Sequence, residues 1–281
     1  MVFASTFISS CPKESITSTY SSAGSSTYTV PSGNNGYLVC TVNGAAGGNT
    51  VSANGGNGAT IGVHIPVTGG QSLTIIVGAK PTATTITNSG NGGGGASGIT
   101  SGVNVIAVAG GGGGAGGTHS GGGSAGAEST TIASPAGIVE SGNNGGYSTN
   151  ITLTGYGGGA YTSGGTAGVS RNNGTAGTRI GGNGGHSGVN ARVAGGNGYV
   201  YTNSYGVSGG SGGNPTADRG GGGGGGGWFG GGGGAIDESA GRGDGGGAGS
   251  SFISTVYTTA QSHSGATSTG NGSVTITYVQ Y

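Results

Sequence analysis

The sequence predicts an all-β protein with almost no α-helix, and three observations lead to this prediction. Of the 281 residues 79 are glycine, and each glycine costs about 1 kcal/mol relative to alanine inside a helix. The chain has only three leucines and few of the charged residues that favour helices. Its 34 threonines and many valines and isoleucines suit a pleated sheet instead.

Composition and charge exclude several other classes. Collagen requires glycine at every third position and abundant proline, whereas the glycine runs are irregular and there are six prolines. No apolar run approaches the roughly 20 residues that span a bilayer, so no membrane insertion is expected. Seven basic residues, balanced by seven acidic ones, leave no basic surface for nucleic acid. Abundant β-branched residues with almost no net charge also argue against disorder.

Strands are expected on both sides of a glycine-rich middle. A Pro-Ser-Gly-Asn-Asn-Gly turn at 31–36 separates the first two of them, and Gly69-Gly70 is typical of a hairpin turn. The segment that closes the chain places Val274 and Ile276 on one face by period-two alternation. The expected strands are 26–30, 37–42, 60–65, 72–77, 103–108, 150–154 and 272–278.

Residues 110–249 contain almost no strand periodicity, and their longest glycine run is 220–227. A flexible linker is the usual interpretation, but so long a linker would be an implausible insertion into a compact domain. The alternative is polyglycine II, a left-handed helix with three residues per turn and no internal hydrogen bonds. Its N–H and C=O groups point outward, so neighbouring copies bond laterally. We therefore expect ordered polyglycine II helices in this region.

The predicted organisation is an N-terminal arm, 1–20, followed by a single domain, 21–281. Within the domain, 21–109 and 250–281 are expected to be rich in strands, and 110–249 in polyglycine II. The N-terminus lacks a basic region and a clean apolar run, so no signal peptide is predicted.

A series of strand-like and glycine-rich segments follows a recognisable order along the chain. These segments are Tyr28–Pro31, Val42–Gly48, Val67–Gly78, Val105–Gly114, Gly227–Gly234, Gly245–Phe252 and Asn271–Thr277. Over roughly residues 20–281 this order resembles that of the glycine-rich domains found in the extracellular part of the anaplastic lymphoma kinase receptor and in many surface and viral proteins.

The resemblance implies a β-sandwich, jelly-roll-like, whose strands are joined by long excursions packed as polyglycine II helices. Relatives of this kind serve as ligand-binding ectodomains, and glycine lattices also form the tips of tail-fibre adhesins in T-even phages. This chain shows no kinase, no transmembrane helix and no cysteine-rich module, so a receptor is not expected.

No catalytic or metal-binding motif is predicted, and no cofactor is expected. The four histidines lack zinc-type spacing, and Cys11 and Cys40 lack C-x-x-C spacing. The two cysteines could form one disulfide, but two buried free thiols are favoured because Cys40 lies in a strand-like segment. Arg242-Gly243-Asp244 matches an integrin-type tripeptide in an expected exposed loop, although glycine-rich sequences produce this match easily.

Aromatic residues that punctuate the glycine segments are the candidate contacts with a partner. Tyrosine and tryptophan among Ser, Asn and Gly form adaptable binding surfaces, and aromatic faces suit sugar rings. The favoured alternative is that these rings seal a glycine lattice that has no side chains to exclude water. The candidates are Tyr156, Tyr161, Tyr199, Tyr201, Tyr205, Trp228 and Phe229.

These observations lead to the hypothesis of a non-enzymatic structural protein of an external assembly, above all a minor capsid or surface component of a virus particle. One alternative is an adhesin that binds host glycan or protein through loops between glycine helices. Another is a secreted filament-forming or matrix protein. The expected partners are further copies of the chain or other coat and surface proteins, and the expected location is a virion or an extracellular surface.

Overall fold

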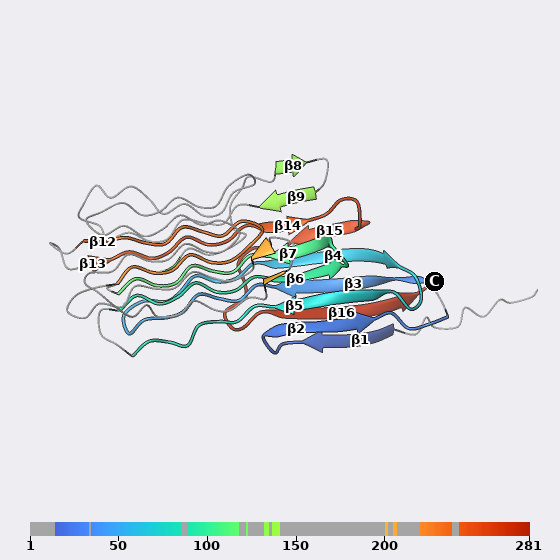
Figure 1. The fold of residues 1–281 in the computed structure, drawn as a ribbon, viewed down its shortest axis with the longest axis horizontal. Helices are drawn as coiled ribbons and strands as arrows, with labels where there is room; N and C mark the ends of the chain where they lie inside the picture. Colours follow the sequence, from blue (N-terminus) through green and yellow to red (C-terminus); the bar gives the residue numbers. More distant parts are fainter. Residues whose placement is uncertain are drawn as a thin grey trace, which may run out of the picture.

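The computed structural model shows an elongated molecule in which a β-sandwich continues at one end into a bundle of glycine-rich segments (Figure 1). Strands are present among the described residues but no α-helix, which confirms the predicted all-β class. The structure describes residues 15–33, 35–85, 89–117, 122, 132–134, 137–140, 200–201, 205–206, 220–237 and 242–281.

One sheet of the sandwich has five antiparallel strands. Its three central strands are each eight residues long and alternate between deeply buried and less buried residues, because apolar side chains occupy every second position. In spatial order the strands are β1 (Ser15–Tyr20), β16 (Ser273–Gln280), β3 (Gly36–Asn43), β4 (Thr60–Val67) and β15 (Ala260–His263).

The other sheet has seven strands, also antiparallel. In spatial order they are β2 (Gly24–Thr29), β5 (Ser72–Val77), β6 (Ser97–Ser101), β7 (Asn104–Ala109), β14 (Ser251–Ile253), β9 (Gly137–Glu140) and β8 (Ile132–Ser134). Four two-residue strands form separate pairs, β10 (Val200–Tyr201) with β11 (Tyr205–Gly206) and β12 (Ile236–Asp237) with β13 (Arg242–Gly243).

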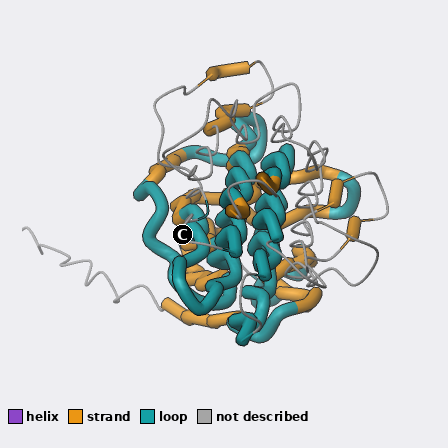
Figure 2. The backbone as a smooth tube through the Cα atoms, turned by 90° about the vertical axis from the view of Figure 1, so that its left-hand side faces the viewer, coloured by secondary structure: helices purple, strands orange, loops and turns teal. Residues whose placement is uncertain are grey.

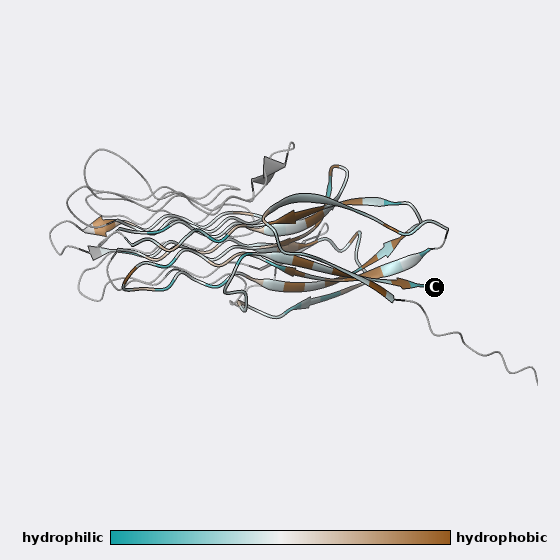
Figure 3. Ribbon diagram, turned by 90° about the horizontal axis from the view of Figure 1, so that it is seen from below, coloured by the Kyte–Doolittle hydropathy of each residue, from teal (hydrophilic) through white to brown (hydrophobic). Residues whose placement is uncertain are grey.

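The core lies between the two sheets. Leu38, Ile61 and Ile276 from the five-stranded sheet and Ile75 and Ile99 from the seven-stranded sheet are fully buried in one cluster. Figure 3 shows this apolar character concentrated in the strands, whereas the glycine-rich end is nearly neutral in hydropathy. The sandwich is therefore the part of the molecule with a conventional hydrophobic core.

The molecule has two different ends, here called the base and the tip. The base is the end of the sandwich formed by segments 30–33, 68–71, 102–103 and 254–259, and the tip is the opposite end, where β12 and β13 lie (Figure 1). Ser15 pairs with Val279, and the N–H of Tyr281 donates to the carbonyl of Asn35 at 3.2 Å. The first described strand therefore begins, and the last one ends, at the base.

Glycine-rich segments lie side by side between the sandwich and the tip, and Figure 2 shows them nearly end-on. They are held together by backbone hydrogen bonds from one segment to another. We call this bundle the glycine lattice. Its described segments are 44–48, 54–59, 89–96, 110–117, 220–228, 230–235 and 243–250.

The hydrogen bonds of the lattice repeat every three residues. The N–H groups of Gly111 and Gly114 donate to the carbonyls of Gly226 and Gly223 at 2.8 and 2.7 Å, whereas Gly112 donates to a different segment. A helix with three residues per turn produces this repeat, because residues three apart project in the same direction. The pattern is that of polyglycine II, as the sequence predicted.

The segment 110–117 occupies the middle of the lattice. It accepts hydrogen bonds from 54–59, 89–96 and 243–250, and it donates to 44–48 and 220–228. Every donor–acceptor distance in the backbone hydrogen bonds to these five segments lies between 2.7 and 3.1 Å. A polyglycine II helix has no internal hydrogen bonds, so this segment depends on its neighbours for every backbone bond.

Close approach of the backbones is what requires glycine in the lattice. A Cβ atom placed on Gly113 would overlap the carbonyl oxygen of Gly246, and one placed on Gly93 would overlap that of Gly224. Alanine occurs only at selected positions, such as Ala45 and Ala115, where the methyl group is fully buried. The carbonyl that would meet the Cβ belongs in each case to an adjacent segment, so the sequence of one segment is constrained by the position of another.

The lattice extends beyond the range in which it was predicted. Residues 44–59 and 89–96 belong to it, although this part of the chain was expected to be rich in strands. Their short glycine runs are interrupted by Ala and Asn, which obscured the polyglycine pattern. Within the predicted arm 1–20, residues Ser15–Tyr20 form β1 in the five-stranded sheet. The strand predicted at 150–154 lies outside the described residues.

Replacing Gly113 with alanine is expected to lower the free energy of unfolding by more than about 2 kcal/mol, because the methyl group would overlap a neighbouring backbone that cannot move without breaking other hydrogen bonds. Gly270→Ala is the matched control, since a Cβ there meets no atom within 4 Å. Urea unfolding followed by tryptophan fluorescence measures both changes. Equal losses in the two variants would contradict the steric explanation.

Candidate functional site

The predicted aromatic contacts fall in different parts of the molecule. Tyr156, Tyr161 and Tyr199 lie outside the described residues. Tyr201 and Tyr205 are paired with each other in the backbone ladder of β10 and β11. Trp228 and Phe229 are half-buried where segment 220–228 returns to the sandwich, which places them far from the tip.

Trp228 packs against the outer face of the seven-stranded sheet. Its ring stacks on Phe252 of β14 with the ring centroids 4.1 Å apart and the planes inclined by 15°. Ile76, Val108 and Ala96 complete the small apolar cluster beneath it. The backbone N–H of Trp228 donates to the carbonyl of Ser250. This hydrogen bond continues the three-residue repeat of the lattice. This geometry supports the sealing role, because the indole covers the junction between lattice and sandwich.

Trp228→Ala is therefore expected to lower the free energy of unfolding by about 2–3 kcal/mol, a fraction of the loss for a fully buried tryptophan, and Trp228→Phe by much less. Unfolding is followed by far-ultraviolet circular dichroism, because Trp228 is the only tryptophan. An unchanged stability in Trp228→Ala would contradict the sealing role and favour a surface held open for a partner.

Cys40 is a free thiol buried in the core, and Cys11 lies outside the described residues. Desolvation raises the pKa of the Cys40 thiol to about 12. The thiolate is the nucleophilic form of cysteine, so Cys40 is inert at neutral pH. Desolvation also raises the pKa of Tyr28, with smaller contributions from Tyr20, Cys40 and Tyr278. Tyr28 and Cys40 are therefore both held in their neutral forms at neutral pH by burial.

In a Cys11→Ser background, Cys40 is expected to resist a thiol reagent at pH 8 and to react at once in denaturant. The thiol favours the folded state below its unfolded pKa near 9, and this contribution is lost as the pH rises through about 12. The rate at which the reagent labels Cys40, measured with and without urea, tests the expectation. Rapid labelling of the native protein would show that the thiol is accessible. The further substitution Cys40→Ala leaves no thiol in the chain and gives the background signal of the reagent.

The remaining titratable groups do not assemble into a metal-binding cluster in the described part of the chain. Among these residues no three His, Cys, Asp or Glu side chains lie together in a way that could hold a metal ion. The ring of His64 stacks on Tyr37 at a centroid distance of 5.8 Å. His119 and His186 lie outside the described residues.

The interpretation of Arg242-Gly243-Asp244 as an exposed loop is wrong for its aspartate. Asp244 is buried, with 1% of its surface exposed, because its backbone belongs to segment 243–250 of the lattice. Its N–H donates to the carbonyl of Ala235, and its carbonyl accepts from Gly222. A carboxylate held inside the molecule cannot reach a receptor, so this tripeptide is not a recognition site.

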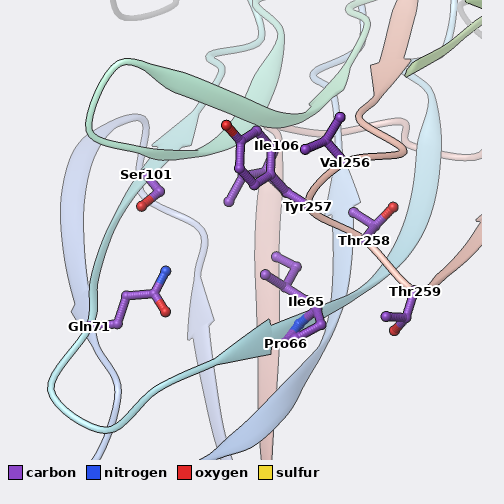
Figure 4. Close-up of a pocket in the computed structure, with 9 residues that line it drawn as sticks. All are labelled: Ile65, Pro66, Gln71, Ser101, Ile106, Val256, Tyr257, Thr258 and Thr259. Atoms are coloured by element: carbon purple, nitrogen blue, oxygen red, sulfur yellow. The ribbon is translucent and has the colours of Figure 1, made fainter. Parts of the chain in front are cut away.

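The base holds a small cleft of about 220 Å³. Figure 4 shows Ile65 and Pro66 on one side of it and Ile106 with Tyr257 on the other, and Gln71 and Thr259 among the polar residues around them. Two apolar side chains are also exposed at this end of the sandwich, Val103 at 65% and Val256 of the cleft lining at 66%. This combination makes the base a surface suited to contact with another protein.

A second hollow, of about 300 Å³, lies on the outer face of the five-stranded sheet, over β3, β4 and β15. Its lining includes Gly62, where a side chain would overlap the hydroxyl group of Ser262 on the neighbouring strand. Hydroxyl groups dominate this face. The hydroxyl oxygens of Thr17 in β1 and Thr277 in β16, for example, are 3.0 Å apart and share a hydrogen bond.

Comparisons with known proteins identify no family. No model of a protein family matches the chain, and the search among curated proteins finds no match. Among the described residues, no helix is long and apolar enough to cross a membrane.

Proposed function

We propose that this protein is a non-enzymatic structural component of an external assembly, such as a virus particle, attached by its base with the glycine lattice directed outward. The observation that supports the proposal is that the two ends of the molecule differ in their surface and in the chain ends they carry. Both ends of the described chain lie at the base, and so do four of its six exposed large apolar side chains, Val103, Val256, Tyr257 and Tyr281, whereas the described segments at the opposite end consist mainly of glycine.

The lattice suits an external position for a physical reason. Its backbone N–H and C=O groups are bonded between segments, and few of its residues carry a reactive or charged side chain. The sandwich contributes an inert core whose thiol is neutral. Such a body projects from a surface as a stiff element and supplies little that a protease or oxidant could attack.

The adhesin alternative is favoured by one observation at the tip. Val51, in the turn between segments 44–48 and 54–59, is 69% exposed, and the hydroxyl group of the neighbouring Thr50 donates to the carbonyl of Gly116 at the outer end of segment 110–117. An apolar side chain presented there could contact a host surface. The two functions place the decisive contact at opposite ends of the molecule, and this makes them separable.

Val256→Asp at the base and Val51→Asp at the tip form a matched pair, because the two valines are 66% and 69% exposed. Introduced into the source organism, Val256→Asp is expected to reduce recovery of the protein in purified particles or the surface fraction at least tenfold. Val51→Asp should leave recovery unchanged. Quantitative immunoblotting measures both.

Absence of the unaltered protein from every external fraction would overturn the proposal. Normal recovery of Val51→Asp combined with lost attachment to the host would instead establish the adhesin alternative. Equal recovery of all three proteins would show that the base is not the attachment surface.

A further inference from the structure

We infer that β1 is a docking edge for a second copy of the chain, which pairs with it as an antiparallel β1 strand around a two-fold axis through Ser18. The inference concerns the purified protein in solution, and it stands whether or not the proposed external assembly exists.

The first observation is that β1 is an open edge. Ser15–Tyr20 form the outermost strand of the five-stranded sheet, and among the described strands they pair only with β16. Among the described residues no backbone group of β1 bonds to any other segment. An edge strand directs half of its N–H and C=O groups away from its sheet. The outward-facing N–H and C=O groups of β1 can therefore form hydrogen bonds with another strand.

The second observation is that β1 lacks the features that normally protect an edge. Proteins block such edges with lysine, proline, bulges or very short strands. The sequence Ser-Ile-Thr-Ser-Thr-Tyr contains neither charge nor proline, and its pairing with β16 runs without interruption over six residues. Four of its side chains are exposed, including Ile16 at 50%. The strand therefore has both the length and the composition for β-augmentation.

A second copy is the partner that this strand fits. A two-fold axis perpendicular to the sheet requires one residue to face itself, because directly opposite residues share a face. With Ser18 on the axis, Ile16 faces Tyr20 of the other copy and Thr17 faces Thr19. Aromatic and β-branched pairs of this kind stabilise antiparallel sheets. The apolar Ile16 side chain would then be covered.

Electrostatics also permit the association. The chain carries seven basic and seven acidic residues, so its formal net charge is zero, and two copies do not repel each other at long range. No charged residue within β1 would have to be desolvated or placed opposite its own copy.

The other described edges fit less well. β15 has four residues, and β8 has three. β2 is as long as β1 and uncharged, but it begins at Gly24 with a φ of 134°. Its one large apolar residue, Tyr28, is already buried, so pairing at β2 would cover no additional apolar side chain.

Sedimentation velocity over micromolar to millimolar concentrations tests the inference with a matched pair of variants. Thr17→Lys places like charges beside the axis and is expected to weaken dimerisation at least tenfold. Thr41→Lys makes the same change on the same face of the sheet, two strands further in, and should leave the dimer intact. A monomeric unaltered protein at every concentration would overturn the inference, as would equal weakening by both variants.

Oxidative cross-linking tests the register. In the Cys11→Ser background, Ser18→Cys is expected to form a disulfide-linked dimer, since Ser18 faces itself across the axis, while the buried Cys40 stays unreactive. Ser25→Cys on β2 is the comparison. Cross-linking of Ser25→Cys without Ser18→Cys would move the interface to the β2 edge, and cross-linking of neither would exclude the register through Ser18. Either result overturns the inference.

Discussion

The lateral N–H···O=C hydrogen bond between polyglycine helices is the interaction on which the rest of the molecule depends. Each such bond contributes a net stabilisation of about 0.5–1.5 kcal/mol, whereas ordering one residue costs about 1–2 kcal/mol, and more for glycine. A single glycine helix is therefore unstable. Only a segment such as 110–117, with five bonded neighbours, gains enough packing and hydrogen bonding to remain ordered.

The sandwich solves the problem of bringing those neighbours together. Segment 44–48 leaves β3 and segment 54–59 returns to β4, and these two strands pair along their entire length. Segment 110–117 continues from β7, and 243–250 leads into β14, the strand hydrogen-bonded to β7. Strand pairing thus fixes the starting points of the helices, and Trp228 closes the junction by stacking on Phe252. The hydrophobic core organises a lattice whose described segments carry no apolar side chain larger than alanine except Trp228.

The sequence predicted the parts of the fold that local composition determines. The alternation in 37–42, 60–65 and 72–77 identified β3, β4 and β5, and the long glycine run 220–227 identified polyglycine II. It did not predict β6 or β14, because Ser97–Ser101 and Ser251–Ile253 are strands only through burial between neighbours. Nor could it place Asp244, since the burial of that residue follows from the positions of the two segments, 220–228 and 230–235, to which its backbone is hydrogen-bonded.

The contrast between features set by local composition and features set by neighbouring segments explains why composition is more informative about this molecule than short motifs are. In a conventional enzyme, a few side chains perform the function and the backbone positions them. Here the lattice consists mainly of backbone, the Cys40 thiol is neutral, and Trp228 stabilises a junction. What distinguishes one surface from another is which backbone groups are already bonded. In the lattice they are bonded between segments, while β1 presents an uncharged open edge. Specificity in such a protein resides in edges and ends, where hydrogen bonding is incomplete.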